Sequence, residues 1–249
     1  MSDPAIPAST LVVVRERSPG PPELLMVERA AGMAFAGGAM VFPGGRIDPA
    51  DEALAGDLGL GEHGAAIVAA VRETLEETAI PVALNPLPSS DQARQFQQAL
   101  IADVPFAGIL RDAGLAIAAA SLEPFARWVP KFHAARRFDT LFFVAKAPPG
   151  DWQPVVIEGE CAGAEWLSAA AVLDRDSRGE GRIIFPTRRN LERLAQHESY
   201  EAILADARKH PVDPITPWLE EHDGMKYVTI ADGIGYPVTR EKLDGLWRG

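Results

Sequence analysis

The chain has a single cysteine, Cys161, among its 249 residues. One cysteine excludes an intrachain disulfide framework and a zinc site built from cysteines alone, and it fits a reducing compartment. Long hydrophobic runs are also missing. The stretch from Leu141 to Ala145 is one of the longest, far below the roughly 20 apolar residues that cross a bilayer. We therefore expect no membrane partner.

Positive charge is scarce as well. Lysine and arginine number 24 against 35 acidic residues, a formal net charge of -11, which is the wrong sign for binding nucleic acid through its phosphates. Residues 1–9 hold two prolines, an aspartate and no basic segment, unlike a secretory signal peptide. We expect a cytoplasmic protein without a nucleic-acid partner. With 47% hydrophobic residues, residues 1–249 can form one domain with a packed core.

Short apolar segments alternate with helical patterns and turn residues along the chain. Apolar and β-branched runs predict strands at 11–14, 24–27, 40–42, 125–129, 141–145 and 155–157. Helical spacing predicts helices at 65–78, 168–173, 187–196 and 200–210. Such mixing favours a layered α/β or α+β domain over a helical bundle or a β-sandwich.

Two further segments stand apart from this alternation. Between Ser89 and Gly114, capping-box spacing of Ser89 and Gln92 and apolar residues three to four apart predict a small helical insert. From 211 to 249 the chain is rich in proline, glycine and β-forming residues. We expect an extended arm there, lying over the core or over a second copy in a homodimer.

The stretch from Arg72 to Glu77 carries the clearest chemistry. On a helix, Glu73, Glu76 and Glu77 share one face, and their mutual repulsion is relieved when a cation binds among them. Oxygen ligands of this kind suit Mg²⁺, and Arg72 can orient a carboxylate by a charge-assisted hydrogen bond. The alternative is an exposed acidic helix face. The upstream turn at 42–45, which ends in two glycines, favours a phosphate or metal site because glycine permits close approach.

Together, the segments 42–48 (FPGGRID) and 72–80 (RETLEETAI) resemble the Nudix box, G-x5-E-x7-R-E-U-x-E-E-x-G-U, where U is aliphatic. Counting from Gly45 places the middle acid on Asp51, and the arginine comes 13 residues later than the pattern requires. The extra segment, 52–64, contains four glycines and is predicted to be a surface loop. Thr74 occupies an aliphatic position. Ala79 replaces the glycine, at a cost of about 1 kcal/mol if it is left-handed.

The split box resembles a Nudix subgroup that includes the peroxisomal coenzyme A diphosphatase. Arg29, the segment 128–130 and the segment 136–140 add to this likeness, which runs discontinuously from about 11 to about 194. Val27, Glu28 and Ala36 depart from a stricter coenzyme A signature of another Nudix branch.

The resemblance implies a Nudix-type α/β/α sandwich with a mixed sheet, and a hydrolase that uses Mg²⁺ or Mn²⁺ to cleave a diphosphate bond in a nucleotide-linked small molecule, coenzyme A or an acyl derivative first among them. It implies that the metal is held by Gly45, Glu73, Glu76, Glu77 and a later acid, Glu160. It also implies a catalytic role for Arg72 beside the glutamates, one of which, or a loop acid, serves as base. The residues expected to bind substrate are Arg29, Arg46, Arg136 and Arg137.

Several alternatives stay open at this point. The same chemistry could act on a nucleotide sugar, NADH or a dinucleotide, and a non-catalytic nucleotide-binding module is a further reading. Glu160 could be a solvated loop acid, and Arg137 could pair with Asp139 rather than with substrate. Trp128 and Trp166 are expected in the core rather than stacked on a base.

Overall fold

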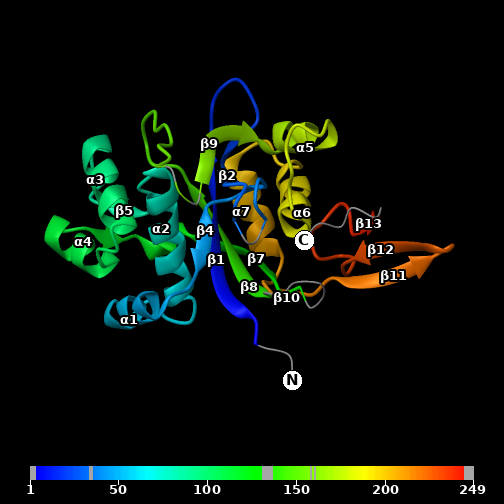
Figure 1. Cartoon of the computed structure of the whole chain (residues 1–249), viewed down its shortest axis with the longest axis horizontal. Helices are drawn as coiled ribbons and strands as arrows, with labels where there is room; N and C mark the ends of the chain where they lie inside the picture. The colour runs from blue at the N-terminus through cyan, green and yellow to red at the C-terminus, as the bar shows by residue number, and fades with distance from the viewer. Residues whose placement is uncertain (1–3, 34–35, 131–136, 158, 160, 244–249) are drawn as a thin grey trace.

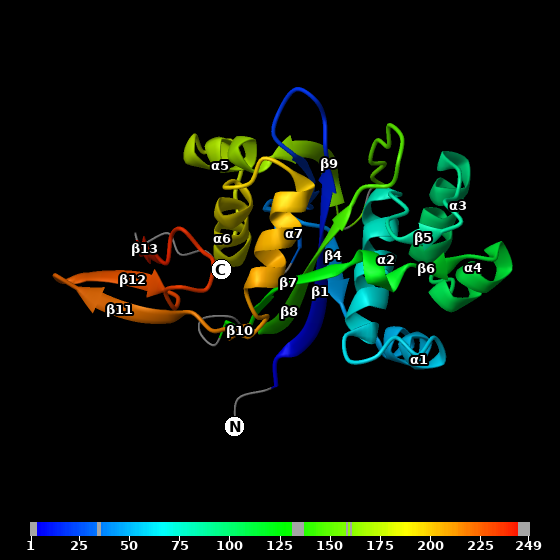
Figure 2. The same cartoon turned by 180° about the vertical axis from the view of Figure 1, so that it is seen from behind.

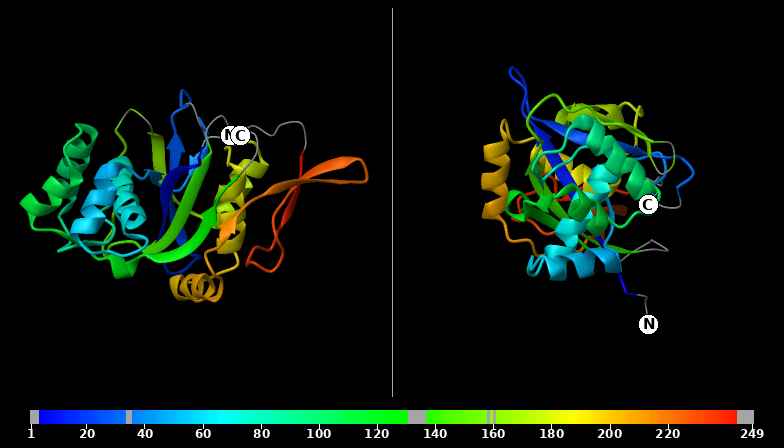
Figure 3. Two further views of the ribbon diagram at one scale, coloured as in Figure 1. Left: turned by 90° about the horizontal axis from the view of Figure 1, so that it is seen from below. Right: turned by 90° about the vertical axis from the view of Figure 1, so that its left-hand side faces the viewer.

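A mixed β-sheet lies between two groups of helices (Figure 1). The structure is a computed structural model that describes residues 4–33, 36–130, 137–157, 159 and 161–243. In the view from below, helices flank the sheet on both sides and a narrow β-arm projects beyond one of them (Figure 3). This is the α/β/α arrangement with a mixed sheet that the resemblance implies.

The sheet has the strand order β10-β7-β8-β1-β2-β3, with β4 paired to β1 and β9 paired to β2. Its strands are β1 (Ile6–Arg15), β2 (Glu23–Arg29), β3 (Met40–Val41), β4 (Gly44–Arg46), β7 (Glu123–Trp128), β8 (Phe138–Lys146), β9 (Cys161–Ser168) and β10 (Pro214–Ile215). The central pair, β1 and β8, is parallel and runs in register from Ile6 with Phe138 to Val14 with Lys146. The strand β1 is apolar without alternation because both of its faces are covered. Leu11 and Val13 belong to the core on one side, and Val12 and Val14 to the core on the other.

One group of helices comprises α1 (Pro49–Asp57), α2 (Gly64–Thr78), α3 (Ser90–Ile101) and α4 (Phe106–Ala113). A small ladder of β5 (Leu84–Asn85) and β6 (Ala116–Ile117) and the 3-10 turn η1 (Ala119–Ser121) accompany them. The opposite group comprises α5 (Ala169–Ser177), α6 (Phe185–Leu194) and α7 (Tyr200–Lys209), with α7 in front of the sheet when the molecule is seen from behind (Figure 2).

The predicted helical insert is confirmed as α3 and α4. Its first helix is capped as expected, since the Ser89 hydroxyl accepts from the Gln92 N–H and the Gln92 side chain accepts from the Ser89 N–H. The buried Gln97 donates to the carbonyl oxygens of Glu76 and Val155, at 3.0 and 2.7 Å. The insert is therefore tied directly to the acidic helix.

Two sequence expectations are wrong. The segment 155–157 is not a strand: the Val155 N–H donates to the Thr78 carbonyl, and the strand in this region is β9. The segment 52–64 is not a surface loop throughout, because it begins inside α1, whose Leu54 and Ala55 are buried in the core against α2. Proline at the first turn starts this helix. Deleting 52–64 would therefore remove core packing.

Ala79, which ends α2 at the glycine position of the Nudix pattern, adopts a left-handed conformation, with φ 55° and ψ 20°. We expect Ala79→Gly to raise the free energy of unfolding by about 0.5–1 kcal/mol, because glycine adopts this conformation without a Cβ penalty. Urea unfolding measures the change. The matched control is Ala70→Gly inside the same helix, which should lower stability by about 1 kcal/mol or more. Equal losses in the two variants would contradict the prediction.

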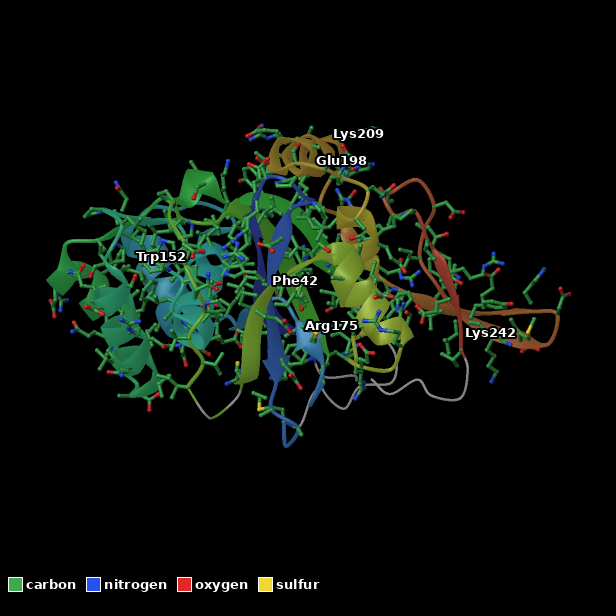
Figure 4. All side chains as sticks on the ribbon, turned by 90° about the horizontal axis from the view of Figure 1, so that it is seen from above. Phe42, Trp152, Arg175, Glu198, Lys209 and Lys242 are labelled. Carbon is green, nitrogen blue, oxygen red and sulfur yellow. The ribbon has the colours of Figure 1, made fainter. Side chains whose placement is uncertain are left out.

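The segment after 211 forms both an arm and a return to the core. Strands β11 (Trp218–His222), β12 (Met225–Thr229) and β13 (Arg240–Lys242) make a separate antiparallel sheet, which carries Lys242 far from the centrally placed Phe42 (Figure 4). Between β12 and β13 the chain returns to the body, where the Tyr236 hydroxyl donates to Asn190 Oδ1 at 2.8 Å. In the described ranges, no helix has the length and apolar character needed to cross a membrane.

Candidate active site

The glycine turn between β3 and β4 packs directly on the acidic helix α2. The Gly44 N–H donates to Glu77 Oε2 at 3.0 Å. A Cβ on Gly45 would lie 2.4 Å from the Glu73 carboxylate, and a Cβ on Gly44 would lie 2.3 Å from the Ser9 carbonyl oxygen. Gly44 therefore requires glycine, because a Cβ there would meet the backbone of β1, and a Cβ at Gly45 would displace the Glu73 carboxylate, in agreement with the close approach inferred from the sequence.

The apolar face of α2 positions the glutamates. Val68, Val71 and Leu75 are buried in the core shared with the sheet, which leaves the acidic face toward the glycine turn. Thr74, which stands at an aliphatic position of the resemblance, is fully buried. Its hydroxyl donates to the Ala70 carbonyl at 2.7 Å, so the polar atom is satisfied inside the helix.

Arg72 connects α1 with the acidic face. Its Nε and Nη2 donate to the two carboxylate oxygens of Asp51, at 2.9 and 2.8 Å, and its Nη1 donates to Glu73 Oε1 at 2.9 Å. Glu76 lies 3.6 Å from the same nitrogen. The bidentate contact with buried Asp51 fixes the guanidinium plane, so Arg72 orients Glu73 as the sequence predicts.

Two of the three glutamates carry strongly raised pKa values. Burial raises the pKa of Glu73 to about 7, although Arg72 acts in the opposite direction. Burial, reinforced by the negative charge of Glu73, raises the pKa of Glu77 to about 8 against the hydrogen bond from Gly44. The buried Cys161 thiol also donates to Glu77, with 3.7 Å between Sγ and Oε1. A cation in this place would offset both burial and repulsion.

These shifts predict how the metal-free protein responds to pH. Between the ordinary pKa of 4.5 and about 8, the folded state binds more protons at Glu73 and Glu77 than the unfolded state does. The contribution of these two groups to the free energy of unfolding is therefore fully present below about pH 4.5. It is lost as the pH rises toward 8. Urea unfolding at pH 5.5 and pH 8 in the presence of a chelator measures this loss of stability. In a separate experiment with Mg²⁺ in place of the chelator, the loss should be smaller. Higher stability at pH 8 without metal would contradict this prediction.

The donor set suits a hard cation, although the metal roles stay a prediction. Carboxylate oxygens from one helix face and a glycine backbone are the ligands that Mg²⁺ and Mn²⁺ take. Among the residues the structure describes, no group of three acidic, histidine or cysteine side chains is already gathered for a metal. Glu160, the later acid implied by the resemblance, lies outside the described residues.

A cavity of about 990 Å³ opens beside the acidic face, a size that accommodates a nucleotide-like molecule. Its lining brings Arg29, Arg46 and Arg137 together with Glu73 and Glu76. Gly45 and Arg72 also line it. Arg136 lies outside the described residues. The structure thus gathers the predicted site residues that it describes around one cavity, with Glu77 hydrogen-bonded to the turn at its edge.

Other residues near the cavity have structural partners. Asp139 accepts two hydrogen bonds from Arg127, at 2.8 and 2.7 Å. Trp128 is buried and donates to Asn190 Oδ1, and Trp166 is buried and donates to the Trp152 carbonyl. Both tryptophans belong to the core, as expected.

The cavity also has walls that the sequence does not identify. Leu100 at the end of α3, Val104 in the connection and Phe106 at the start of α4 form one wall. The start of α6 contributes Ile184 and Thr187. The sequence does not indicate that the first turn of α6 forms a wall of the cavity. Pro186, a residue that often starts helices, marks that turn in the sequence but says nothing of what it faces.

Comparison with known proteins identifies the fold. No protein-family model matches the chain. No curated protein matches it either. The crystal structure of a NUDIX hydrolase from Alicyclobacillus acidocaldarius is 29% identical, with a TM-score of 0.69, over 82% of this chain and 97% of that one. The NUDIX domain of Shewanella oneidensis NrtR, complexed with ADP ribose, is 13% identical with a TM-score of 0.46 over 78% and 88% of the two chains. The chain has the fold of the Alicyclobacillus hydrolase, and this likeness supports an enzyme of the Nudix kind.

Proposed function

From the Nudix fold and the acidic site, we propose that the chain hydrolyses a diphosphate bond in a nucleoside-diphosphate-linked small molecule with Mg²⁺ or Mn²⁺. The observation that carries this proposal is the pair of carboxylates with raised pKa values, Glu73 and Glu77, packed against the Gly44 and Gly45 backbone. This desolvated acidic pair beside an arginine-lined cavity suits a cation and a phosphate together.

In this proposal Glu73, Glu76, Glu77 and the Gly45 carbonyl hold the metal, with Glu160 as an additional ligand. A metal held by these residues would polarise the phosphate and lower the pKa of the attacking water. Arg72 keeps Glu73 in place through the contacts described above. A carboxylate of this group takes the proton from the water.

The arginines of the cavity bind the phosphates of the substrate. Arg29 on β2, Arg46 on β4 and Arg137 just before β8 line the cavity, and Arg136 is proposed to join them. A guanidinium group matches phosphate oxygens in a bidentate manner. These residues position the diphosphate and need no contact with the attacking water.

We propose coenzyme A or acyl-coenzyme A as the substrate. The subgroup resemblance supports it, and so does the apolar lining from Leu100, Val104 and Phe106, along which a pantetheine arm would lie. The departures at Val27, Glu28 and Ala36 keep a nucleotide sugar, NADH or a dinucleotide as the alternative. A non-catalytic nucleotide-binding module is less favoured, because Glu73, Glu76 and Glu77 are all present.

A substrate panel tests the proposal. Coenzyme A, 3′-dephospho-coenzyme A, ADP-ribose, NADH and a nucleotide sugar are incubated with Mg²⁺ or Mn²⁺ in ¹⁸O-labelled water, and products are identified by mass. Coenzyme A should give 3′,5′-ADP and 4′-phosphopantetheine, with label in one of them. Faster cleavage of ADP-ribose or NADH would reject coenzyme A. Binding without cleavage of any substrate would favour the binding module.

We further propose a cytoplasmic, single-domain protein that forms a homodimer through the β-arm. Trp218, Leu219 and Met225 are exposed on β11 and β12, and burial of such apolar surface would stabilise a second copy. Light scattering of the wild type and of Trp218→Ser tests the dimer. A monomeric wild type at micromolar concentration would reject it.

A further inference from the structure

The central strand β1 carries a polar side chain, Ser9, that is fully buried. Its hydroxyl oxygen has no hydrogen-bond partner among the residues that the structure describes. A buried hydroxyl without a partner costs free energy, because its hydrogen bonds to water are lost on folding. Leu11 and Val13, which follow at alternate positions on the same face of β1, are apolar core residues. Packing alone would therefore favour an apolar residue in place of Ser9.

The register of the sheet places Ser9 against the acidic helix. Ser9 is paired with Gly45 of the antiparallel strand β4 and with Leu141 of the parallel strand β8. Leu141 belongs to the same core as the apolar face of α2, so Ser9 faces α2 as well. Opposed residues of an antiparallel pair have Cβ atoms about 4.5–5.5 Å apart on one face, and a Cβ on Gly45 would lie 2.4 Å from the Glu73 carboxylate. The side chain of Ser9 therefore extends into the space between the sheet and α2 that Glu73 also occupies.

The carboxylate of Glu73 is able to accept a hydrogen bond from this hydroxyl. Its neighbour on the helix, Glu77, accepts hydrogen bonds on both carboxylate oxygens. Glu73 accepts from Arg72 on Oε1 at 2.9 Å. Since an ionised carboxylate offers about four lone-pair positions, Glu73 has room for a neutral donor in addition to Arg72 and a cation. Ser9 supplies a donor of that kind from the strand that packs on the helix.

We propose that Ser9 is a positioning residue for the metal site, whose hydroxyl donates to the Glu73 carboxylate when that carboxylate binds a cation. Together with Arg72, this hydrogen bond keeps the carboxylate in one orientation. Groups that hydrogen-bond to a metal ligand raise the affinity for the metal by orienting the ligand. The inference rests on the proposed function, in which Glu73 is a metal ligand. Because the hydroxyl has no partner among the described residues without a cation, it contributes to metal binding and not to the stability of the metal-free fold.

The variant Ser9→Ala separates these two contributions. Mn²⁺ is titrated into the full chain at pH 8, and free Mn²⁺ is measured by electron paramagnetic resonance. We expect Ser9→Ala to weaken Mn²⁺ binding about tenfold, the lower end of the range for groups that hydrogen-bond to a metal ligand. The midpoint of urea unfolding in the presence of a chelator should be unchanged or higher, because a buried hydroxyl without a partner is removed. A purely structural role would give the opposite pair of results, a lower midpoint with unchanged affinity.

The matched control is Thr74→Val, which removes another fully buried hydroxyl, next to Glu73 on α2. The Thr74 hydroxyl already donates to the Ala70 carbonyl at 2.7 Å, and valine has nearly the same shape as threonine. Thr74→Val should therefore bind Mn²⁺ as the wild type does.

Each result decides for or against the role of Ser9. Wild-type Mn²⁺ affinity in Ser9→Ala, or equal weakening in Thr74→Val, would overturn it while the metal site of the proposed function stands. A lower midpoint of unfolding in metal-free Ser9→Ala, or failure of this variant to fold, would overturn it too, since the hydroxyl would then stabilise the fold itself. If the wild type binds no Mn²⁺ at millimolar concentration, the metal site of the proposed function fails, and the role of Ser9 fails with it.

Discussion

Glu77→Gln is expected to lower turnover by roughly a thousandfold or more while the protein stays folded. The glutamine oxygen can still accept the Gly44 N–H that Glu77 accepts at 3.0 Å, so the turn keeps its contact with α2. The substitution removes one negative charge from the proposed metal site, and with it the polarisation of phosphate and water. It also removes a desolvated charge beside Glu73, so stability without metal at pH 8 should be unchanged or higher.

Turnover at saturating Mg²⁺, Mn²⁺ affinity and thermal melting are measured together. The matched control is Glu52→Gln, which changes an exposed glutamate on α1 and should keep wild-type turnover. If Glu77→Gln keeps near-wild-type activity at saturating metal, Glu77 is not a ligand and the metal assignment is wrong.

Asp51→Ala is expected to lower the free energy of unfolding by about 3–5 kcal/mol, the range for removing one partner of a buried ion pair. The Asp51 side chain is 1% exposed, accepts two hydrogen bonds from Arg72 and accepts a third from the Asp48 N–H at 2.9 Å. Without it, a largely buried guanidinium loses its bidentate partner, and the start of α1 loses an acceptor. Glu73 would also lose its fixed orientation, so activity should fall along with stability.

Urea unfolding gives the change in stability. Asp57→Ala, at the exposed end of the same helix, is the control and should stay within about 0.5 kcal/mol of the wild type. A loss below 1 kcal/mol for Asp51→Ala would mean that the ion pair with Arg72 contributes little to the fold.

The acidic helix and the glycine turn could be predicted because their signals are local. Apolar spacing placed α2 almost to the residue, and the order of prolines and glycines located the turn before β4. The resemblance placed the middle acid of the pattern on Asp51 but did not show its partner. Its contact with Arg72 joins two helices, α1 and α2, and could not be read from either segment alone. The glycines of 52–64 suggested a loop, but Pro49 and the buried pair Leu54 and Ala55 make α1 a helix.

What the sequence could not show depends on pairing between distant segments. The strand β9 contains alanine and glycine at 162–164, a weak strand pattern, and its pairing with β2 defines it. The apolar segment 155–157 has a stronger strand pattern in the sequence. The backbone hydrogen bonds of Val155, however, are made with the Thr78 carbonyl and the Gln97 side chain instead of with a strand. Likewise, nothing local to Thr187 says that the start of α6 faces the cavity.

The parallel pairing of β1 with β8 has a consequence for synthesis on the ribosome. Strand β1 is at the centre of the sheet, but its register from Ile6 with Phe138 to Val14 with Lys146 leaves one of its edges open until β8 has emerged. At about 5–20 residues per second, that wait is on the order of ten seconds. The motif residues from Gly44 to Glu77 emerge well before then. The nascent chain thus carries the glycine turn and the three glutamates of α2 on half a sheet, with an apolar strand edge exposed, until translation supplies the strand that completes the core beneath them.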